Sequence, residues 1–358
     1  MRSISSFNAD ERKYTNTNTN TNIANILPMT TPRLLKHHIP ISKNIQNVVH
    51  TTREHIKQIL NHTSYKKMVI VGPCSIHDTK AAMDYANRLA NVQVLYPNLL
   101  LIMRVYFEKP RTVTGWKGLI MDPELDNSCK IEQGLCMARQ LLVDINSLGV
   151  PVGCEFLDTI SAQYFDDLVS WGAIGARTVE SQLHRQLASG LSTPIGFKNS
   201  TSGDIDVAIH SILSSKESHT FLGINSNGNA SVVQTKGNPN CHIILRGGQT
   251  PNYFKHIVDA VSLQCISKGV QPNIMIDCSH GNSQKNYTNQ HRVLQSVCAQ
   301  LQQSKSNIIG VMIESNIHAG KQNLIQKEDL IYGVSITDAC IDWEETVIML
   351  NELNQNCL

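Results

Sequence analysis

An α/β barrel is the fold that the sequence predicts, because eight short apolar segments alternate with stretches of helical apolar spacing along its 358 residues. Uninterrupted apolar runs of this length are typical of strands buried on both faces, and such strands are usually parallel. Eight strand–helix units with right-handed crossovers close into a (β/α)8 TIM barrel, whose active site lies at the carboxyl ends of the strands. We expect this barrel to carry an N-terminal extension and one inserted β-hairpin.

The N-terminal extension is expected to span residues 1–65, ahead of a catalytic barrel at 66–358. Residues 15–22 alternate Thr and Asn, a low-complexity polar tract with nothing to bury, which we expect to be mobile. Farther along, helical apolar spacing predicts a helix that plugs or flanks the barrel, with apolar positions Ile45, Val48, Val49, Ile56, Ile59 and Leu60.

Each predicted barrel strand ends in a charged or metal-seeking side chain. In chain order these residues are Cys74, Arg104, Glu155, Arg177, Lys198, Arg246, His280 and Glu314. The expected helices span roughly 79–95, 129–147, 161–171, 182–190, 204–215, 252–268, 288–304 and 341–353. An open, doubly wound sheet is the competing fold. It is disfavoured because polar residues follow every strand, whereas an open sheet gathers its ligand groups near one switch point.

An insertion at about residues 217–240 interrupts the alternation of strands and helices. Two strand-like runs flank the turn-forming sequence Ser226-Asn-Gly-Asn, which predicts a β-hairpin outside the barrel. The sequence leaves open whether this hairpin is a surface decoration, a subunit contact or a regulatory element.

Composition limits the class of function. The 31 Lys and Arg and 29 Asp and Glu residues give a formal charge of +2 without a dense basic run, so neither nucleic acid nor a membrane is an expected partner. The ten Cys include no Cys-x-x-Cys pair, which favours thiols kept reduced in a cytosol. No apolar run approaches the roughly 18 residues of a membrane span, and the N-terminus lacks the apolar core of a secretion signal. We therefore expect a soluble, cytoplasmic protein.

A metal site is predicted where the first, seventh and eighth strands end, because these strands become neighbours when the barrel closes. Cys74, His280 and Glu314 end these strands, and Asp338, in the following segment, is a candidate fourth ligand. Thiolate, imidazole and carboxylates suit one divalent ion such as Mn, Fe, Co or Zn rather than Ca or Mg. An isolated Cys is more often a small buried apolar residue, so this prediction depends on the convergence of its partners.

Cations dominate the other strand ends. Arg104, Arg177, Lys198 and Arg246 end four strands, and the loop after the second strand adds Lys109 and Arg111. Any one strand-end cation commonly pairs with a structural acid, but about six facing one opening favour phosphate-bearing substrates. Glu155 is the one acid in this arc, where it is a candidate to hydrogen-bond a water or orient neighbouring cations.

The sequence contains five long strings: Gly72-Pro-Cys-Ser-Ile-His-Asp, Met103-Arg-Val-Tyr-Phe-Glu-Lys-Pro-Arg-Thr, Trp171-Gly-Ala-Ile-Gly-Ala-Arg-Thr, Ile244-Leu-Arg-Gly-Gly and Ser335-Ile-Thr-Asp-Ala-Cys. Together they resemble the bacterial, metal-dependent 3-deoxy-D-arabino-heptulosonate 7-phosphate (DAHP) synthases. Three more strings most resemble the tyrosine-sensitive kind, namely Phe221-Leu-Gly-Ile-Asn, Gln234-Thr-Lys-Gly-Asn-Pro and Asp277-Cys-Ser-His-Gly-Asn. The resemblance runs from about Met29 to the C-terminus.

The resemblance implies the first step of the shikimate pathway to chorismate and the aromatic amino acids, in which phosphoenolpyruvate, D-erythrose 4-phosphate and water give DAHP and phosphate. It implies metal ligation by Cys74, His280, Glu314 and Asp338. It also implies phosphoenolpyruvate binding by Arg104, Arg177, Lys198 and Arg246, and erythrose 4-phosphate binding by Lys109, Arg111 and Thr112.

Within that reaction, Lys109 is expected to protonate or stabilise the alkoxide, with a pKa lowered by neighbouring cations. Glu155, with Lys198 and Arg246, is expected to position the attacking water. The resemblance further implies a homodimer or homotetramer and feedback inhibition by an aromatic amino acid, with tyrosine favoured. The matching effector-pocket positions are Leu187, Ser192 and Phe221.

Two other functions remain to be distinguished. The related 3-deoxy-D-manno-octulosonate 8-phosphate synthases use arabinose 5-phosphate, but the string Lys109-Pro-Arg-Thr disfavours them. A catalytically silent barrel that senses a phosphorylated metabolite or an aromatic amino acid is disfavoured by the complete set of candidate ligands and cations.

Overall fold

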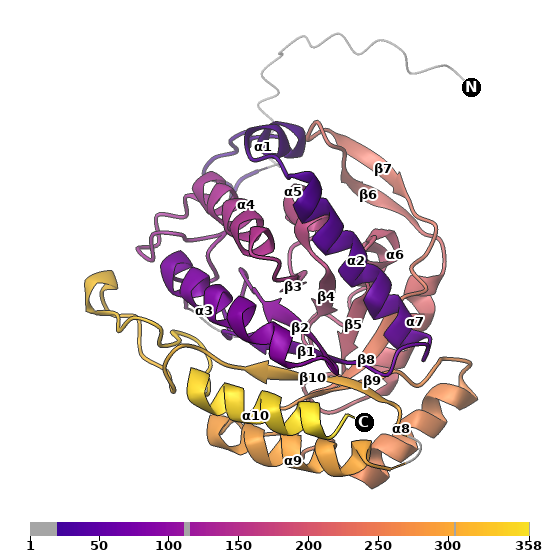
Figure 1. Ribbon diagram of the computed structural model, residues 1–358. Helices are drawn as coiled ribbons and strands as arrows, with labels where there is room; N and C mark the ends of the chain where they lie inside the picture. The colour runs from indigo at the N-terminus through magenta and orange to yellow at the C-terminus, as the bar shows by residue number, and fades with distance from the viewer. Residues whose placement is uncertain (1–19, 111–114, 304–305, 358) are drawn as a thin grey trace, which may run out of the picture.

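Eight parallel strands form a closed barrel at the centre of the molecule, and helices surround it (Figure 1). The computed structural model describes residues 20–110, 115–303 and 306–357. The barrel strands are β1 (Lys67–Gly72), β2 (Leu99–Arg104), β3 (Val152–Glu155), β4 (Trp171–Ile174), β5 (Ile195–Lys198), β8 (Cys241–Leu245), β9 (Ile274–Asp277) and β10 (Ile308–Glu314). Their order around the barrel is β1-β10-β9-β8-β5-β4-β3-β2, and β2 pairs with β1 to close it. The predicted barrel is therefore confirmed.

Helices follow the barrel strands close to the positions that the apolar spacing predicts. They are α3 (Thr79–Val92), α4 (Ile131–Ser147), α5 (Ala162–Phe165), α6 (Gln182–Gly190), α7 (Asp206–Lys216), α8 (Lys255–Ser267), α9 (Gln290–Leu301) and α10 (Trp343–Gln355). The helix expected at 161–171 is the exception, because α5 has four residues and a 3-10 turn at Asp166–Leu168 follows it. Trp171 already pairs with Gly153 in the sheet, so the helix must end before it.

The helix before the first strand closes one end of the barrel. Ile56 and Ile59 of α2 (Lys43–Leu60) pack into the apolar cluster that fills the barrel interior. The side chain of Asn273, directly before β9, donates a hydrogen bond to the carbonyl of Leu60 at 2.9 Å. This contact lies at the amino ends of the strands. Helix α2 therefore plugs that end of the barrel and leaves the carboxyl ends of the strands available for a site.

The inserted segment forms the expected antiparallel hairpin outside the barrel, from β6 (Thr220–Ile224) and β7 (Ala230–Gln234) (Figure 1). The carbonyl of Ser226 in its turn accepts a hydrogen bond from the backbone N–H of Arg33, in helix α1 (Pro32–His38), at 2.8 Å. The hairpin therefore contacts the N-terminal part of the chain.

The structure does not test two expectations about the N-terminal part of the chain. Residues 15–19 of the Thr/Asn tract lie outside the described residues, so the mobility expected of that tract stays a prediction, as does the division at residue 65. Within the described ranges, no helix combines the length and the apolar character needed to cross a membrane.

Candidate active site

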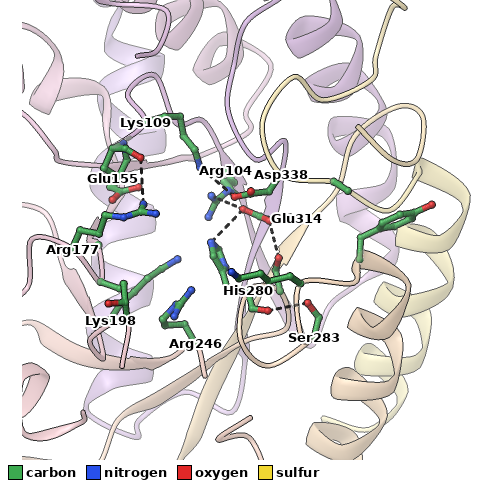
Figure 2. Close-up of a pocket in the computed structure, with 18 of the residues that line it drawn as sticks. Arg104, Lys109, Glu155, Arg177, Lys198, Arg246, His280, Ser283, Glu314 and Asp338 are labelled. Carbon is green, nitrogen blue, oxygen red and sulfur yellow. Dashed lines mark hydrogen bonds and ion pairs between the residues drawn. The ribbon is translucent and has the colours of Figure 1, made fainter. Parts of the chain in front are cut away.

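The carboxyl ends of the barrel strands surround a cavity of about 330 Å³, a size suited to small-molecule ligands (Figure 2). Its wall contains most of the residues predicted for catalysis and binding, namely Arg104, Lys109, Glu155, Arg177, Lys198, Arg246, His280, Glu314 and Asp338. Cys74 is buried beside the cavity, and Arg111 and Thr112 lie outside the described residues.

The convergence of these side chains follows from the barrel. Arg104, Glu155, Lys198 and Glu314 are the last residues of β2, β3, β5 and β10, and the other strand-end residues follow their strands within three positions. Parallel strands in a closed barrel all end at the same rim. Residues far apart in the chain therefore meet around one opening.

A cluster of potential metal ligands occupies one side of the cavity. Cys74, Glu314 and Asp338 can each offer a ligand atom within 4.8 Å of the others. The Sγ of Cys74 lies 3.5 Å from the Oδ2 of Asp338. His280 is not part of this three-residue group, but its Nε2 lies 3.7 Å from the Oε1 of Glu314. One thiol, one imidazole and two carboxylates fit a borderline divalent ion.

The protonation of this cluster favours a cation. Burial raises the pKa of the Cys74 thiol to about 11, so an ion that binds there must displace the thiol proton. Burial alone would also raise the pKa of Glu314, but the nearby His280 and Arg104 outweigh it and hold that pKa below its usual range. Glu314 is therefore an ionised carboxylate ready to accept a cation.

Arg104 is held rigidly next to this cluster. Its guanidinium is 1 % exposed and pairs with the Oε1 of Glu314 at 2.9 Å. It also donates to the carbonyls of Pro73 and Cys74 at 3.1 and 3.2 Å. The Tyr106 ring lies beneath it, with 3.7 Å between the guanidinium carbon and the ring centroid. This buried charge is oriented before any substrate arrives.

The remaining cations line the opposite side (Figure 2). Lys198 is 5 % exposed, and its Nζ lies 2.9 Å from the Oδ2 of Asp277. The guanidinium of Arg246 donates to the carbonyl of Gly247 at 3.2 Å, and that of Arg177 to the carbonyl of Pro110 at 3.3 Å. These charges face the cavity together, which makes its wall strongly attractive to anions.

The surroundings of Lys109 differ from the sequence-based expectation. Its Nζ lies 3.1 Å from the Sγ of Cys74 and 4.0 Å from the Oδ2 of Asp338, so its neighbours are a thiol and an acid. Burial favours the neutral amine, but Cys74 and Glu314 outweigh burial and the repulsion of Arg104, and the pKa of Lys109 is raised. The expectation that neighbouring cations lower this pKa is therefore wrong.

Glu155 lies against the backbone that follows β4. Its Oε1 is 2.1 Å from the position that a Cβ atom would take at residue 175, where the chain has Gly. Gly175 and Glu155 both line the cavity. The glycine therefore makes the room in which this carboxylate faces the cations.

Sequence reasoning missed several residues of the site. Asp277 is fully buried and contacts both Lys198 and His280, while Lys285 and Lys321 line the cavity. The signal for Asp277 was present, since this acid ends a buried apolar strand as the other site residues do. The left-handed backbone of His280 and Lys285, with φ of 53° and 60°, is visible only in three dimensions.

The predicted effector residues lie away from the cavity wall, on and near elements that contact each other. Leu187 is buried on α6, Ser192 is exposed just after it, and Phe221 is half-buried on β6. Hydroxyls of Ser189 and Thr235 lie 2.7 Å apart and join α6 to the end of the hairpin. The assignment of an effector to these residues stays a prediction.

Comparison with known proteins identifies the family. A protein from Candida albicans named phospho-2-dehydro-3-deoxyheptonate aldolase, tyrosine-inhibited, is 52 % identical over 92 % of this chain and 91 % of its own length. A Phe-sensitive protein of the same name from Escherichia coli is 49 % identical over 92 % of this chain and 94 % of its own. The structure of such an aldolase from Francisella tularensis superposes with a TM-score of 0.92 at 47 % identity, covering 94 % of this chain and 98 % of that one. Since the sequence pattern of the DAHP synthetase I family also matches residues 40–351, this chain belongs to that family.

Proposed function

We propose that this protein condenses phosphoenolpyruvate with D-erythrose 4-phosphate and water to give DAHP and inorganic phosphate, the first step of the shikimate pathway. The observation that carries the proposal is one cavity in which clustered cations face an imidazole and two carboxylates, with the Cys74 thiol buried directly beside them. Relatives named for the product, phospho-2-dehydro-3-deoxyheptonate, match along more than nine-tenths of the chain and support the same reaction.

The substrates are assigned by charge. Phosphoenolpyruvate carries a phosphate and a carboxylate, and we assign it to Arg104, Arg177, Lys198 and Arg246, which we term the anion cradle. Arg104 and Lys198 are almost fully buried, and electrostatic attraction is stronger in that environment than in water. Lys109 lies at the junction between the cradle and the ligand cluster, and we assign it to erythrose 4-phosphate together with Arg111 and Thr112.

Cys74, His280, Glu314 and Asp338 would hold one divalent ion, which we propose to be Mn, Fe, Co or Zn because the donors mix sulfur, nitrogen and oxygen. Such an ion supplies Lewis acidity that makes the aldehyde carbon of erythrose 4-phosphate more electrophilic.

The residues of the chain then act in two stages. When C3 of phosphoenolpyruvate attacks the aldehyde carbon, the Lys109 ammonium stabilises or protonates the alkoxide that forms. The raised pKa of Lys109 favours the charged ammonium that this role requires. Water next adds to C2, positioned by Glu155 with Lys198 and Arg246. The resulting hemiketal phosphate releases inorganic phosphate by cleavage of its C–O bond.

A phosphate-release assay tests the reaction. Turnover with erythrose 4-phosphate that stops with a chelator and returns with added divalent metal supports the proposal. Turnover with arabinose 5-phosphate instead would assign the chain to octulosonate phosphate synthesis. Binding of phosphoenolpyruvate without turnover of either aldose phosphate would favour a catalytically silent barrel that senses a phosphorylated metabolite.

Feedback inhibition by tyrosine is the second part of the proposal, with Leu187, Ser192 and Phe221 as effector-binding residues in a homodimer or homotetramer. The test compares tyrosine, phenylalanine and tryptophan as inhibitors, each rate being normalised to the uninhibited rate. Phe221→Ala is expected to raise the half-inhibitory tyrosine concentration about tenfold, the effect of losing about 1.4 kcal/mol of binding. Leu222→Ala is the matched control, since Leu222 is next along the strand and 88 % exposed. Equal inhibition by all three amino acids would contradict tyrosine selectivity.

A further inference from the structure

Asp277 is a buried acid to which the reaction above gives no role. It is the last residue of β9 and is 0 % exposed. Its Oδ2 lies 2.9 Å from the Nζ of Lys198 and 2.9 Å from the Nδ1 of His280. Its Oδ1 accepts a hydrogen bond from the backbone N–H of Ser279 at 3.0 Å. One carboxylate oxygen thus contacts a residue of the anion cradle and a residue of the ligand cluster.

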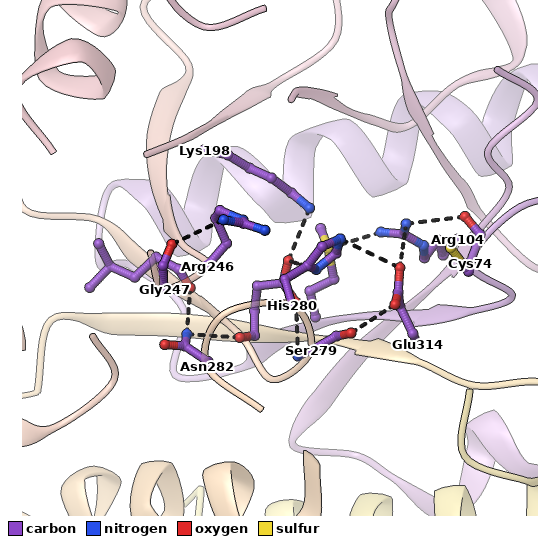
Figure 3. Close-up of polar contacts among 12 residues, drawn as sticks. Cys74, Arg104, Lys198, Arg246, Gly247, Ser279, His280, Asn282 and Glu314 are labelled. Atoms are coloured by element: carbon purple, nitrogen blue, oxygen red, sulfur yellow. Dashed lines mark hydrogen bonds and ion pairs between the residues drawn. The ribbon is translucent and has the colours of Figure 1, made fainter. Parts of the chain in front are cut away.

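The contact belongs to a longer series of groups. Beyond His280, the Nε2 lies 3.7 Å from the Oε1 of Glu314, and the same oxygen lies 2.9 Å from the guanidinium of Arg104 (Figure 3). The order is therefore Lys198, Asp277, His280, Glu314 and Arg104. Two cations of the cradle stand at the ends, and two ligand residues stand between them. Both end cations are buried, so solvent screens their interactions little.

The position of Asp277 is suited to orienting His280. A carboxylate at one ring nitrogen of an imidazole keeps the proton there and leaves the other nitrogen free to bind a metal. Here the Nδ1 of His280 lies 2.9 Å from the Oδ2 of Asp277, a contact at ion-pair distance that does not form an aligned hydrogen bond. The left-handed backbone of His280 turns the ring between Asp277 and Glu314.

We propose that Asp277 is a positioning residue that makes divalent ion and phosphoenolpyruvate bind cooperatively, an inference that rests on the proposed function. When a cation binds His280, the imidazole N–H interacts more strongly with Asp277. The carboxylate of Asp277 then neutralises less of the charge of Lys198, and Lys198 attracts phosphate more strongly. Conversely, when phosphate pairs with Lys198, the negative charge of Asp277 interacts mainly with His280. The imidazole of His280 is then a stronger metal ligand. By linkage, each ligand must strengthen the other by the same factor.

The main experiment measures that factor in the wild type and in Asp277→Asn, which keeps the size of the side chain and removes its charge. Calorimetric titration gives the Mn²⁺ affinity with and without phosphoenolpyruvate, and the phosphoenolpyruvate affinity with and without Mn²⁺. The variant is expected to bind Mn²⁺ about 10- to 100-fold more weakly, as is usual when a carboxylate behind a ligating His is lost. Its coupling factor is expected to fall toward one.

Ser279→Ala is the matched control. The hydroxyl of Ser279 donates to the Oε2 of Glu314 at 2.7 Å, so its loss affects the ligand cluster without touching Lys198. This variant is expected to bind Mn²⁺ more weakly while it keeps the coupling factor of the wild type. A control variant that loses the coupling as fully as Asp277→Asn would contradict a specific role for Asp277.

Two further measurements complete the test: the first covers the case in which Asp277→Asn fails to fold, and the second applies when that variant folds. Lys198→Gln removes the cation that shares Asp277, and it is expected to tighten Mn²⁺ binding several-fold in the absence of phosphoenolpyruvate; an unchanged or weaker affinity would overturn the coupling. In Co²⁺-loaded wild type and Asp277→Asn, the sulfur-to-cobalt absorption from Cys74 should persist. The d–d bands should shift between them, because the imidazole changes.

The outcomes separate the two proposals. A wild-type protein that binds neither Mn²⁺ nor phosphoenolpyruvate contradicts the proposed function itself. A wild-type protein that binds both independently, or an Asp277→Asn variant with an undiminished coupling factor, overturns the role of Asp277 and leaves the proposed function intact.

Discussion

At the scale of single residues, the site combines groups that are costly to bury alone. Cys74 has a thiol pKa of about 11, and Glu314 is fully buried next to Arg104. A buried charge needs a partner, and removing one partner leaves the other uncompensated. The arrangement is thus best understood as a preorganised site for a cation and anions.

Removal of the Cys74 sulfur tests the metal assignment. Cys74→Ala is expected to lower the divalent-ion affinity and the phosphate-release rate at least about 100-fold, because a ligand is lost outright. The measurements are the metal content after dialysis and turnover at saturating metal. Cys136→Ala is the control, since Cys136 is an exposed thiol on α4. Full activity of Cys74→Ala with saturating metal would exclude this ligand.

Glu108, next to Lys109, predicts a pH dependence of stability. Burial raises its pKa to about 7, and the nearby Asp158 adds to the effect. The folded protein therefore holds this proton to higher pH than the unfolded chain does. The free energy of unfolding should consequently fall as pH rises from the ordinary glutamate pKa to about 7, and then level off.

Glu108→Gln removes the free-energy cost of ionising a buried carboxylate at position 108. The variant is expected to be more stable than the wild type by roughly 1–3 kcal/mol at pH 8, with the difference vanishing toward pH 4. Urea unfolding at pH 5, 6, 7 and 8 measures the trend. A difference that is constant with pH would show that Glu108 is ionised in the folded protein throughout this range.

At the scale of elements, packing between helices outside the barrel depends on named polar contacts. His291 on α9 places its Nδ1 and Nε2 each 2.6 Å from a carboxylate oxygen of α10, those of Glu345 and Glu352. Its partial burial opposes the imidazolium, but hydrogen bonds to Glu352 and Glu345 outweigh this and raise the pKa of His291. The charged imidazole therefore joins the two helices.

The sign of this effect gives a second pH-dependent prediction. Because the folded pKa of His291 is raised, its stabilisation is fully present below the unfolded value near 6.5 and is lost as pH rises through the folded value. His291→Gln is expected to lower the melting temperature at pH 5.5 by a few degrees and to have little effect at pH 9. Thermal unfolding at both pH values checks this. An equal loss at pH 9 would point to packing rather than charge.

At the scale of the whole molecule, barrel closure positions the ligand cluster. β1 pairs with β10 beside Gly310, where a Cβ atom would lie 2.1 Å from the carbonyl oxygen of Met68. Cys74 follows β1 and Glu314 ends β10, so this seam sets the distance between two ligands. Stability and ion binding should therefore fail together when it is disturbed.

Gly310→Ala tests that dependence. Crowding against backbone atoms is expected to destabilise the protein by more than about 2 kcal/mol and to weaken Mn²⁺ binding. Gly269→Ala is the control, since its φ of 71° is strained for Ala but no atom lies within 4 Å of the added Cβ. That control should lose only about 1–2 kcal/mol and keep its metal affinity. A destabilised Gly310→Ala variant with normal Mn²⁺ affinity would contradict the prediction, because it would show that the pairing of β1 with β10 does not set the distance between the ligands.

The sequence by itself determined the barrel, its plug helix, the hairpin and most of the cavity wall. Continuous apolar runs in the sequence predict buried strands. When parallel strands close into a barrel, their carboxyl ends all lie at one rim, however far apart they are along the chain. A local sequence pattern does not predict the surroundings of a side chain when residues distant in the chain create those surroundings. The surroundings of Lys109, the shared carboxylate of Asp277 and the short α5 were decided only by tertiary structure. Charge pairing, burial and strand register depend on distances between segments, and these exist only after the chain has folded.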